Sequence, residues 1–429
     1  MAERAKLRFH DLLLRPDPSR TVVRPFEPGY PTGFDGGVTR TQETVDFILA
    51  LGETELARQL DGVTASLHND NHRDVDALLR RRFDEITDRF EGAEVCDDAR
   101  RRLIGAYFLQ EYAYEAAALF NPSAVLHPDQ AGAADGEVRF VMSLRGIGEG
   151  HVSSVTFRTG RWRPGEEPVV DEPGPVSVPP IIDRAGEDDA FIRLHCGGSR
   201  TMAETVLFPV LPSQRQGIED MRLVRFTEED GSVAYHGTYT AFSGAKARSE
   251  LLTTSDFVTF DMRALTGDAA GGKGMALFPR RVAGRFAMLG RHDNKNIWLL
   301  GSDDILDWNG GAKLIEPRYP WEFVQMGNCG SPIELDEGWL VLTHGVGTVR
   351  NYCMGACLLD KADPSKLLAR TPRPILAPSP KQRDGYVPNV VYSCGALAVG
   401  RELLLPYAVA DSFTAFATGS IDDLLAVMD

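Results

Sequence analysis

The stretch GWLVLTHGV (338–346) is a short apolar run that begins and nearly ends on a glycine. Apolar and β-branched runs of this length, bounded by Gly, Asp or Pro, are typical of β-strands. Comparable runs follow one another after residue 120, with almost no helical periodicity between them: EVRFVMSLR (137–145), HVSSVTFRTG (151–160), SVAYHGTYTAF (232–242), RFAMLGR (285–291), NIWLLGSDD (296–304) and ELLLPYAVAD (402–411). Many short strands at regular spacing favour a closed all-β architecture.

A weak internal repeat narrows the choice of architecture. LLTTSDFVTF (251–260) and WLLGSDDILDW (298–308) each place a Ser-Asp step and an aromatic residue after a strand. Propeller blades often end in this way. We therefore predict a β-propeller over residues 121–429. A β-sandwich is the weaker alternative, because about 300 residues of strands is long for one.

The first 120 residues have a different pattern, which predicts three or four helices and thus an N-terminal helical extension over 1–120. The segment DDARRRLIGAYFLQEYAYEAAALF (97–120) starts with an Asp that can cap a helix, and we expect the helix to continue for several turns. Because their apolar stripes are too wide for isolated helices, we also expect an oligomer face and a homo-oligomer. The residues at helical spacing include Val45, Ile48, Leu49, Leu56 and Leu60.

Composition excludes several kinds of partner. The formal net charge of −15 argues against nucleic acid and against an anionic membrane surface, while a local cationic cluster can still bind a small anion. No run of about 20 apolar residues is present, and the first residues lack the apolar core of a secretory signal. The six cysteines form no zinc pattern, although Cys353 and Cys357 make a CxxxC. We expect a cytoplasmic protein with buried free thiols and no metal.

Polar stretches follow successive predicted strands, where the central cavity of a propeller would collect them. A site for a polyhydroxylated substrate needs such a collection of Asp, Arg, His, Tyr and Asn, whereas a structural protein does not. The stretches are RGIGEGHVSS (145–154), GIEDMR (217–222), GKGMALFPRR (272–281), GRHDN (290–294), GNCGSP (327–332), THGV (343–346), YVPNVVY (386–392) and YAVAD (407–411).

The segment from about Asn121 to the C-terminus resembles glycoside hydrolase family 130. Members of that family are five-bladed propellers that act on β-mannosides, mostly as inverting phosphorylases and in some cases as hydrolases. The resemblance therefore implies a five-bladed propeller for residues 121–429. It is carried by GIEDMR (217–222), where the family has a Glu-Asp-Pro-Arg step, ALFPRRVAGRFAMLGR (276–291), SPIELDEGWLVLTHGV (331–346), YCMGACLLD (352–360) and VPNVVYSCGAL (387–397).

The resemblance implies that Asp220 is the general acid. A protonated carboxyl near the glycosidic oxygen helps a poor leaving group depart. Family members are thought to pass this proton through a sugar hydroxyl, so Asp220 need not touch the bond. Met221 replaces the family's Pro, and Glu219 would hold the geometry of the acid or raise its pKa by like charge. The alternative for the Glu-Asp pair is a solvated turn.

The resemblance also implies a cationic phosphate pocket formed by Arg291, His344, Tyr352 and, in place of a second arginine, Lys273. Glu334 departs from the family, because phosphorylases often have a lysine there. It weakens the phosphate interpretation and would serve as the base that activates water in a hydrolase.

The resemblance also implies residues that hold sugar hydroxyls, a role that suits side chains with paired donors or acceptors. For Trp321 and Tyr239, stacking on a sugar ring and a role in the core are equally open. The substrate-binding candidates are Arg145, Ser153, Ser154, Glu219, Asn389 and Asp411.

The resemblance, together with these residues, implies an inverting phosphorylase that cleaves β-mannosides, such as manno-oligosaccharides, with inorganic phosphate to give α-mannose 1-phosphate. Phosphate is then a co-substrate, and no cofactor is needed. The alternatives are an inverting β-mannosidase that uses water and a non-catalytic carbohydrate-binding propeller.

Overall fold

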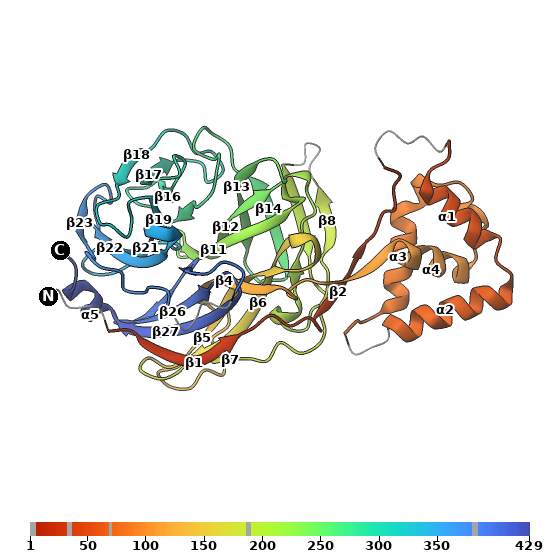
Figure 1. Ribbon diagram of the computed structural model, residues 1–429, viewed down its shortest axis with the longest axis horizontal. Helices are drawn as coiled ribbons and strands as arrows, with labels where there is room; N and C mark the ends of the chain where they lie inside the picture. The colour runs from red at the N-terminus through yellow and green to blue at the C-terminus, as the bar shows by residue number, and fades with distance from the viewer. Residues whose placement is uncertain (1–5, 32–36, 68–70, 186–189, 380–384) are drawn as a thin grey trace. The chain divides into compact units, whose positions relative to one another are not determined.

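The protein divides into two compact units in the computed structural model, which describes residues 6–31, 37–67, 71–185, 190–379 and 385–429. The helical unit comprises residues 19–113 and 174–179, and the strand-rich unit comprises residues 1–18, 114–173 and 180–429 (Figure 1). The sequence analysis placed all of residues 1–120 in the helical extension. The structure groups residues 1–18 and 114–120 with the strands.

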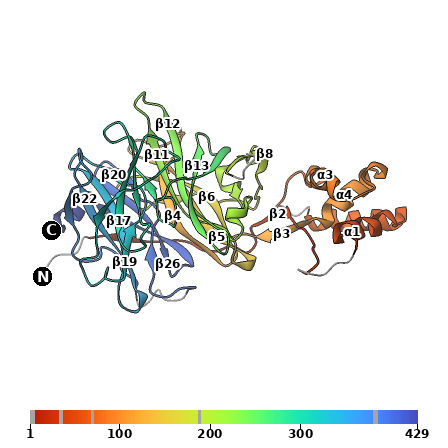
Figure 2. The same ribbon diagram turned by 90° about the horizontal axis from the view of Figure 1, so that it is seen from above.

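Antiparallel sheets build the strand-rich unit (Figures 1 and 2). The largest has eleven strands in the order β4-β5-β6-β11-β12-β13-β14-β9-β8, with β7 and β10 also paired to β6. Its two main antiparallel groups meet where β6 and β11 run parallel, at Gly217 opposite Ser153. The strands are β4 (Ala118–Leu126), β5 (Val138–Ile147), β6 (Ser153–Trp162), β7 (Val169–Val170), β8 (Ile181–Ala185), β9 (Phe191–His195), β10 (Val206–Leu207), β11 (Gly217–Thr227), β12 (Val233–Phe242), β13 (Ala247–Thr254) and β14 (Thr259–Ala264).

Three smaller sheets complete this unit within the described residues. One has the order β15-β16-β17-β18, the next β19-β21-β22-β23 with β20 on β21, and the last β1-β27-β26-β24 with β25 on β26. The first and last strands of the chain thus pair with each other. The strands are β15 (Ala276–Leu277), β16 (Phe286–Gly290), β17 (Ile297–Ser302), β18 (Ala312–Ile315), β19 (Gln325–Asn328), β20 (Ile333–Glu334), β21 (Trp339–Val346), β22 (Tyr352–Leu359), β23 (Leu367–Arg370), β24 (Val391–Tyr392), β25 (Leu397–Val399), β26 (Glu402–Val409), β27 (Phe413–Ser420) and β1 (Arg8–Leu14).

Every stretch predicted as a strand from its apolar run lies in one of these sheets. The unit is mostly β, and no single closed sheet forms among the described residues. Short 3-10 helices and a C-terminal α-helix connect or follow the strands: η3 (Glu149–His151), η4 (Met202–Glu204), η5 (Pro212–Gln214), η6 (Thr348–Arg350) and α5 (Ile421–Ala426).

Apolar clusters between neighbouring sheets hold the strand-rich unit together. Leu342 of β21, Val391 of β24 and Leu405 of β26 belong to one cluster, and each is at most 4% exposed. Burying one such side chain contributes about 1.5–3 kcal/mol. Since residues of three strands meet there, this core fixes the sheets that carry the polar stretches. All six cysteines are buried free thiols, as predicted.

The helical unit contains four α-helices among the described residues, in agreement with the three or four predicted. Thr39 and Asp97 cap α1 and α4, because their side chains accept from the backbone N–H groups of Gln42 and Arg100. None of the described helices is long and apolar enough to span a membrane. The elements are β2 (Thr21–Pro25), α1 (Arg40–Leu49), α2 (Glu53–Leu67), α3 (Val75–Ile86), η1 (Thr87–Arg89), η2 (Ala93–Val95), α4 (Asp98–Tyr107) and β3 (Leu109–Ala113).

The helix predicted in the segment 97–120 begins at its Asp cap as expected, but it does not fill the segment. α4 ends at Tyr107, and the following residues form β3 and the start of β4. β3 pairs with β2, and β4 pairs with β5. Their partners lie outside the segment, so tertiary pairing overrides the local helical propensity of the alanines.

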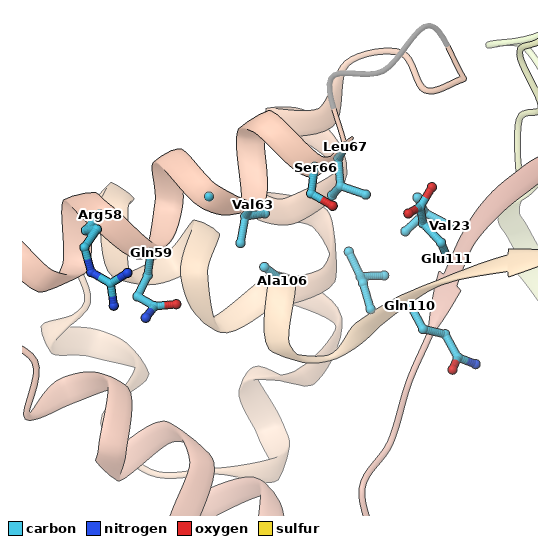
Figure 3. Close-up of a pocket in the computed structure, with 11 residues that line it drawn as sticks. Val23, Arg58, Gln59, Val63, Ser66, Leu67, Ala106, Gln110 and Glu111 are labelled. Atoms are coloured by element: carbon cyan, nitrogen blue, oxygen red, sulfur yellow. The ribbon is translucent and has the colours of Figure 1, made fainter.

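A hollow in the helical unit lies between α2, the end of α4 and the β2–β3 ribbon (Figure 3). None of the sequence-predicted site residues lines it. Its lining residues are Val23, Arg58, Gln59, Gly62, Val63, Ser66, Leu67, Ala106, Leu109, Gln110 and Glu111.

Candidate active site

Asp220 lies at a β-bulge in β11. The pairing of β11 with β12 is interrupted between Glu219 and Arg222, and Asp220 has a φ of +53°. A left-handed backbone is uncommon at a residue other than glycine and is found at functional sites, as are bulges. The side chain is 19% exposed and accepts hydrogen bonds, so the pair is not a solvated turn.

Arg145 connects the two adjacent carboxylates. Its Nη1 lies 3.0 Å from Asp220 Oδ1 and its Nη2 lies 2.8 Å from Glu219 Oε1, while Nε donates to Ser153 Oγ at 2.8 Å. Asn121 Nδ2 donates to the same oxygen of Asp220 at 2.6 Å. The guanidinium therefore sets the geometry of Glu219 and Asp220 together, and Ser153 sets the geometry of the guanidinium.

Charged neighbours control the protonation of these carboxyls. Burial acts to raise the pKa of Asp220, but Arg145, Arg222 and the Asn121 hydrogen bond outweigh it and lower the pKa. Asp220 is thus a carboxylate in the free protein, and the expectation that Glu219 raises its pKa is not the net result. Burial, together with the charge of Asp220, raises the pKa of Asp411 to about 6.

Arg291 and His344 form the second part of the site. Arg291 Nη1 lies 3.1 Å from His344 Nε2, and His344 Nδ1 lies 3.2 Å from the carbonyl oxygen of Asn328. Because a guanidinium only donates, Nε2 accepts and the ring proton is on Nδ1. Burial and the charges of Arg291 and Arg222 keep the pKa of His344 well below its usual value, so the ring is neutral.

Tyrosine rings enclose this histidine. The rings of His344 and Tyr352 are stacked with centroids 6.0 Å apart, and Tyr392 meets His344 edge-on at 5.0 Å. A Cβ on Gly327 would lie 2.6 Å from His344 Cε1 and 2.9 Å from Arg291 Cδ. Only glycine at this position lets the pair come so close to the strand.

Arg222 links the two parts, and the sequence analysis did not assign it. Its Nη1 donates to the Asp220 carbonyl oxygen at 3.1 Å, its Nη2 to Tyr392 Oη at 2.6 Å, and its Nε to Asn328 Oδ1 at 3.2 Å. Asn121 was missed as well. Arg222, Asn328 and Tyr392 lie inside the quoted polar stretches 217–222, 327–332 and 386–392. A search for buried polar residues in those stretches would have found them.

The remaining substrate-binding candidates lie in the same unit. Ser154 Oγ is buried without a hydrogen-bond partner among the described residues. The carbonyl oxygen of Asn389 accepts from the backbone N–H of Tyr352 at 2.9 Å. Asn389 and Asp411 have φ values of +65° and +49°. Like Asp220, both therefore have the uncommon left-handed backbone.

Two predicted site residues have other partners. Lys273 Nζ lies 3.3 Å from Glu219 Oε2, so this lysine pairs with a carboxylate of the site. Glu334 accepts from Arg280 at 2.8 Å through both oxygens, and Lys361 lies 3.4 Å away. Its contacts lie in this surface cluster and not with Asp220 or Arg291, and they do not support a role as base.

The two aromatic candidates for sugar stacking are packed. Tyr239 is 2% exposed, and its hydroxyl donates to Glu250 at 2.6 Å. Cβ atoms on Gly345 and Gly355 would lie 2.6 Å and 2.5 Å from the ring of Trp321, which therefore fills the space above these glycines. Tyr239 therefore has the structural role, whereas Trp321 packs on these glycines and remains partly exposed.

The fold and the site define a carbohydrate-active enzyme, in which a carboxyl stands near a buried cationic group in a mostly-β unit. No cluster of His, Cys, Asp and Glu that would hold a metal ion occurs in the part of the chain described. The family model for β-1,4-mannooligosaccharide phosphorylase matches residues 198–429. The chain belongs to this family, glycoside hydrolase family 130.

Relatives of known activity support this assignment. A 1,2-β-oligomannan phosphorylase from Thermoanaerobacter sp. (strain X514) is 31% identical over 226 residues, which cover 50% of this chain and 74% of the relative. A β-1,2-mannobiose phosphorylase from Listeria innocua is 33% identical over 228 residues, covering 51% and 62% of the two chains. The structure of a β-1,2-mannobiose phosphorylase from Listeria innocua with β-1,2-mannobiose has the same fold, with a TM-score of 0.51, 24% identity, and 72% and 92% of the chains covered.

Proposed function

We propose that this protein is an inverting β-mannoside phosphorylase that transfers the mannosyl group of a manno-oligosaccharide to inorganic phosphate. The observation that carries the proposal is the juxtaposition, through Arg222, of the Asp220 carboxyl and the Arg291–His344 pair. An acid and an anion pocket are the two parts that phosphorolysis requires.

We also propose that the strand-rich unit is a five-bladed propeller. The order of contacts between strands supports it: β4 contacts β11, β12 contacts β15, β16 contacts β19, β22 contacts β24, and β26 contacts β4. The series of contacts begins and ends at β4, as expected if the five groups of strands follow one another in a closed ring. The pairing of β1 with β27 would then close the last blade.

Asp220 acts on the leaving group in this proposal. The bond from the anomeric carbon to the glycosidic oxygen breaks, and the oxygen takes a proton that comes from Asp220, directly or through a sugar hydroxyl. Because Asp220 is ionised in the free protein, it must take up this proton from solvent when the complex forms, and the proton that the attacking hydrogen phosphate releases replaces it. A bound mannoside promotes this by excluding water from the carboxyl.

Phosphate attacks the anomeric carbon from the opposite face, so a β-mannoside gives α-mannose 1-phosphate. Arg291 suits the phosphate because it has no carboxylate partner among the described residues and its buried Nε has no hydrogen-bond partner there. Charge-assisted hydrogen bonds from a guanidinium to phosphate are strong and directional. Arg222 adds a second positive charge, and Tyr352 lines the ring of His344.

The test is incubation of the purified protein with β-1,2-mannobiose and with β-1,4-mannobiose, each with and without phosphate. The proposal expects α-mannose 1-phosphate that forms only with phosphate. It requires neither a metal nor an organic cofactor, so EDTA should leave the rate unchanged. Release of free mannose at an equal rate without phosphate would identify a hydrolase instead, and binding without turnover would identify a carbohydrate-binding protein.

A further inference from the structure

Arg222 is a buried charge with an unusual set of partners. It is 3% exposed, and no carboxylate side chain forms an ion pair with it among the described residues. Removing a guanidinium from water costs several kcal/mol, which a hydrogen-bonded carboxylate would normally offset. Here neutral groups take that place, namely Tyr392 Oη, Asn328 Oδ1 and the Asp220 carbonyl oxygen. An apolar side chain at this position would make the folded protein more stable, so we expect the Arg222 charge to have a functional role.

The three partners come from three different strands. Asp220 is on β11, Asn328 on β19 and Tyr392 on β24. The hydrogen bonds to Tyr392 and Asn328 fix the guanidinium plane, since both partners are themselves buried or nearly so. The fixed plane then presents Nη1 to the backbone of Asp220.

The backbone of Asp220 needs such support. Its left-handed conformation is less stable than the ordinary strand conformation for a residue with a Cβ. If the peptide relaxed to that conformation, the bulge would be lost and the carboxyl would turn away from Asn121 and Arg145, because a strand alternates its side chains between faces. The hydrogen bond from Arg222 holds the peptide on which the direction of the carboxyl depends.

We propose that Arg222 is a positioning residue. Hydrogen bonds to Tyr392 and Asn328 fix its guanidinium, which donates to the carbonyl oxygen of Asp220 and so fixes the direction of the Asp220 carboxyl. The inference rests on the role of Asp220 in the proposed function. Arg222 also lies beside the anion pocket, since a Cβ on Gly274 would lie 3.6 Å from Arg291 Nε and 3.9 Å from Arg222 Nη2. Arg222 thus contacts both the backbone of the proposed acid and the region where we expect phosphate to bind.

The charge of Arg222 gives a signature that a purely structural residue lacks. It lowers the pKa of Asp220, so replacing Arg222 by Gln raises that pKa and moves the alkaline limb of the kcat/KM profile to higher pH. The charged and titratable groups that face Asp220 are Arg145, Arg222, Lys273, Glu219, Asp411, His344, Tyr392 and Cys394.

The experiment compares Arg222→Gln, Arg222→Lys and Tyr392→Phe in phosphorolysis across a range of pH. Arg225→Gln is the matched control, because Arg225 is an exposed arginine of the same strand. We expect Arg222→Gln to lower kcat about 100-fold with the KM for mannoside changed less than about threefold, and Lys to restore part of the rate. Tyr392→Phe, which keeps the charge, should lower kcat about tenfold without moving the pH profile.

An unchanged kcat in Arg222→Gln, or a loss confined to KM, would overturn the inference. Should Arg222→Gln fail to fold, Tyr392→Phe decides, because it removes one hydroxyl only. A crystal structure of either variant gives a readout independent of turnover: we expect Asp220 to leave the left-handed region, and a φ still near +53° with both carboxyl contacts intact would contradict the proposal. Failure of the wild-type enzyme to use phosphate would instead count against the proposed function.

Discussion

Arg291 Nη1 lies 3.1 Å from His344 Nε2, although β16 and β21, the strands that lead to and carry these residues, belong to different sheets. The histidine accepts this bond as a neutral ring, so the pair retains the full charge of the guanidinium. A charge that is fixed, partly buried and without a carboxylate partner among the described residues suits a phosphate ion.

Replacing Arg291 by Ala should therefore weaken phosphate use. A charge-assisted hydrogen bond to phosphate contributes about 1.5–3 kcal/mol, so the KM for phosphate should rise about 10- to 100-fold. The KM for mannoside should change much less. Initial rates over a matrix of both substrates measure the two effects. Arg280→Ala, which removes a partly exposed arginine of the Glu334 cluster, is the control.

Asp220→Asn should lower kcat about 10²–10⁴-fold, because the amide cannot supply the proton. The amide can still accept from Asn121 and Arg145, so the variant should still fold, although it loses the stability that the ionised carboxyl contributes. A variant that keeps more than a tenth of the wild-type rate would remove Asp220 from the mechanism.

Glu334→Gln distinguishes a base from a surface ion-pair partner. Since Glu334 pairs with Arg280 and Lys361, we expect kcat to change less than about threefold and stability to change by less than about 1 kcal/mol. A loss of 100-fold or more, together with phosphate-independent release of mannose, would restore the hydrolase interpretation.

Asp411 should make stability depend on pH. Its folded pKa of about 6 is above the ordinary 3.8, so the folded state holds the proton more tightly than the unfolded state. The stability that this proton contributes is fully present below pH 3.8 and is lost as the pH rises through about 6. Asp411→Asn should remove this loss and, relative to wild type, gain up to about 3 kcal/mol between pH 4 and pH 8.

Urea unfolding of both proteins at the two pH values measures the difference for Asp411. Asp336→Asn, at a fully exposed carboxylate, is the control and should follow the wild type. An equal pH dependence in wild type and Asp411→Asn would show that the carboxyl titrates normally. For Asp220 the pH dependence of stability has the opposite sign. Its lowered pKa contributes stability above pH 3.8, and this stability is lost in more acidic solution.

The helical unit should mediate a homo-oligomer through its exposed aromatic side chains. Phe47 of α1 is 76% exposed and lines a hollow together with Phe26 and Tyr107. We expect Phe47→Ser to shift the assembly toward monomer in analytical ultracentrifugation. Phe323→Ser, at a 61% exposed aromatic of the strand-rich unit, should not. A monomeric wild-type protein would contradict the prediction.

The sequence by itself determined the elements with a clear local period. The run 338–346 is β21, and the spacing of Val45 and Ile48 marks α1, because burial of one face imposes the period on the chain. The motif GIEDMR likewise pointed to Asp220 and to the family, because a motif of consecutive residues can be recognised without knowing the fold.

Only the tertiary structure decided which residues meet. Arg222 and Tyr392 are 170 positions apart, and no local pattern relates them. Glu334 stood beside a family motif, yet Arg280, 54 positions away, holds it at the surface. Residues 109–113 have helical neighbours in sequence but form β3, because β2 offers them a partner. A local period reports which face is buried, whereas charge pairing and strand pairing depend on atoms that the chain brings together only when it folds.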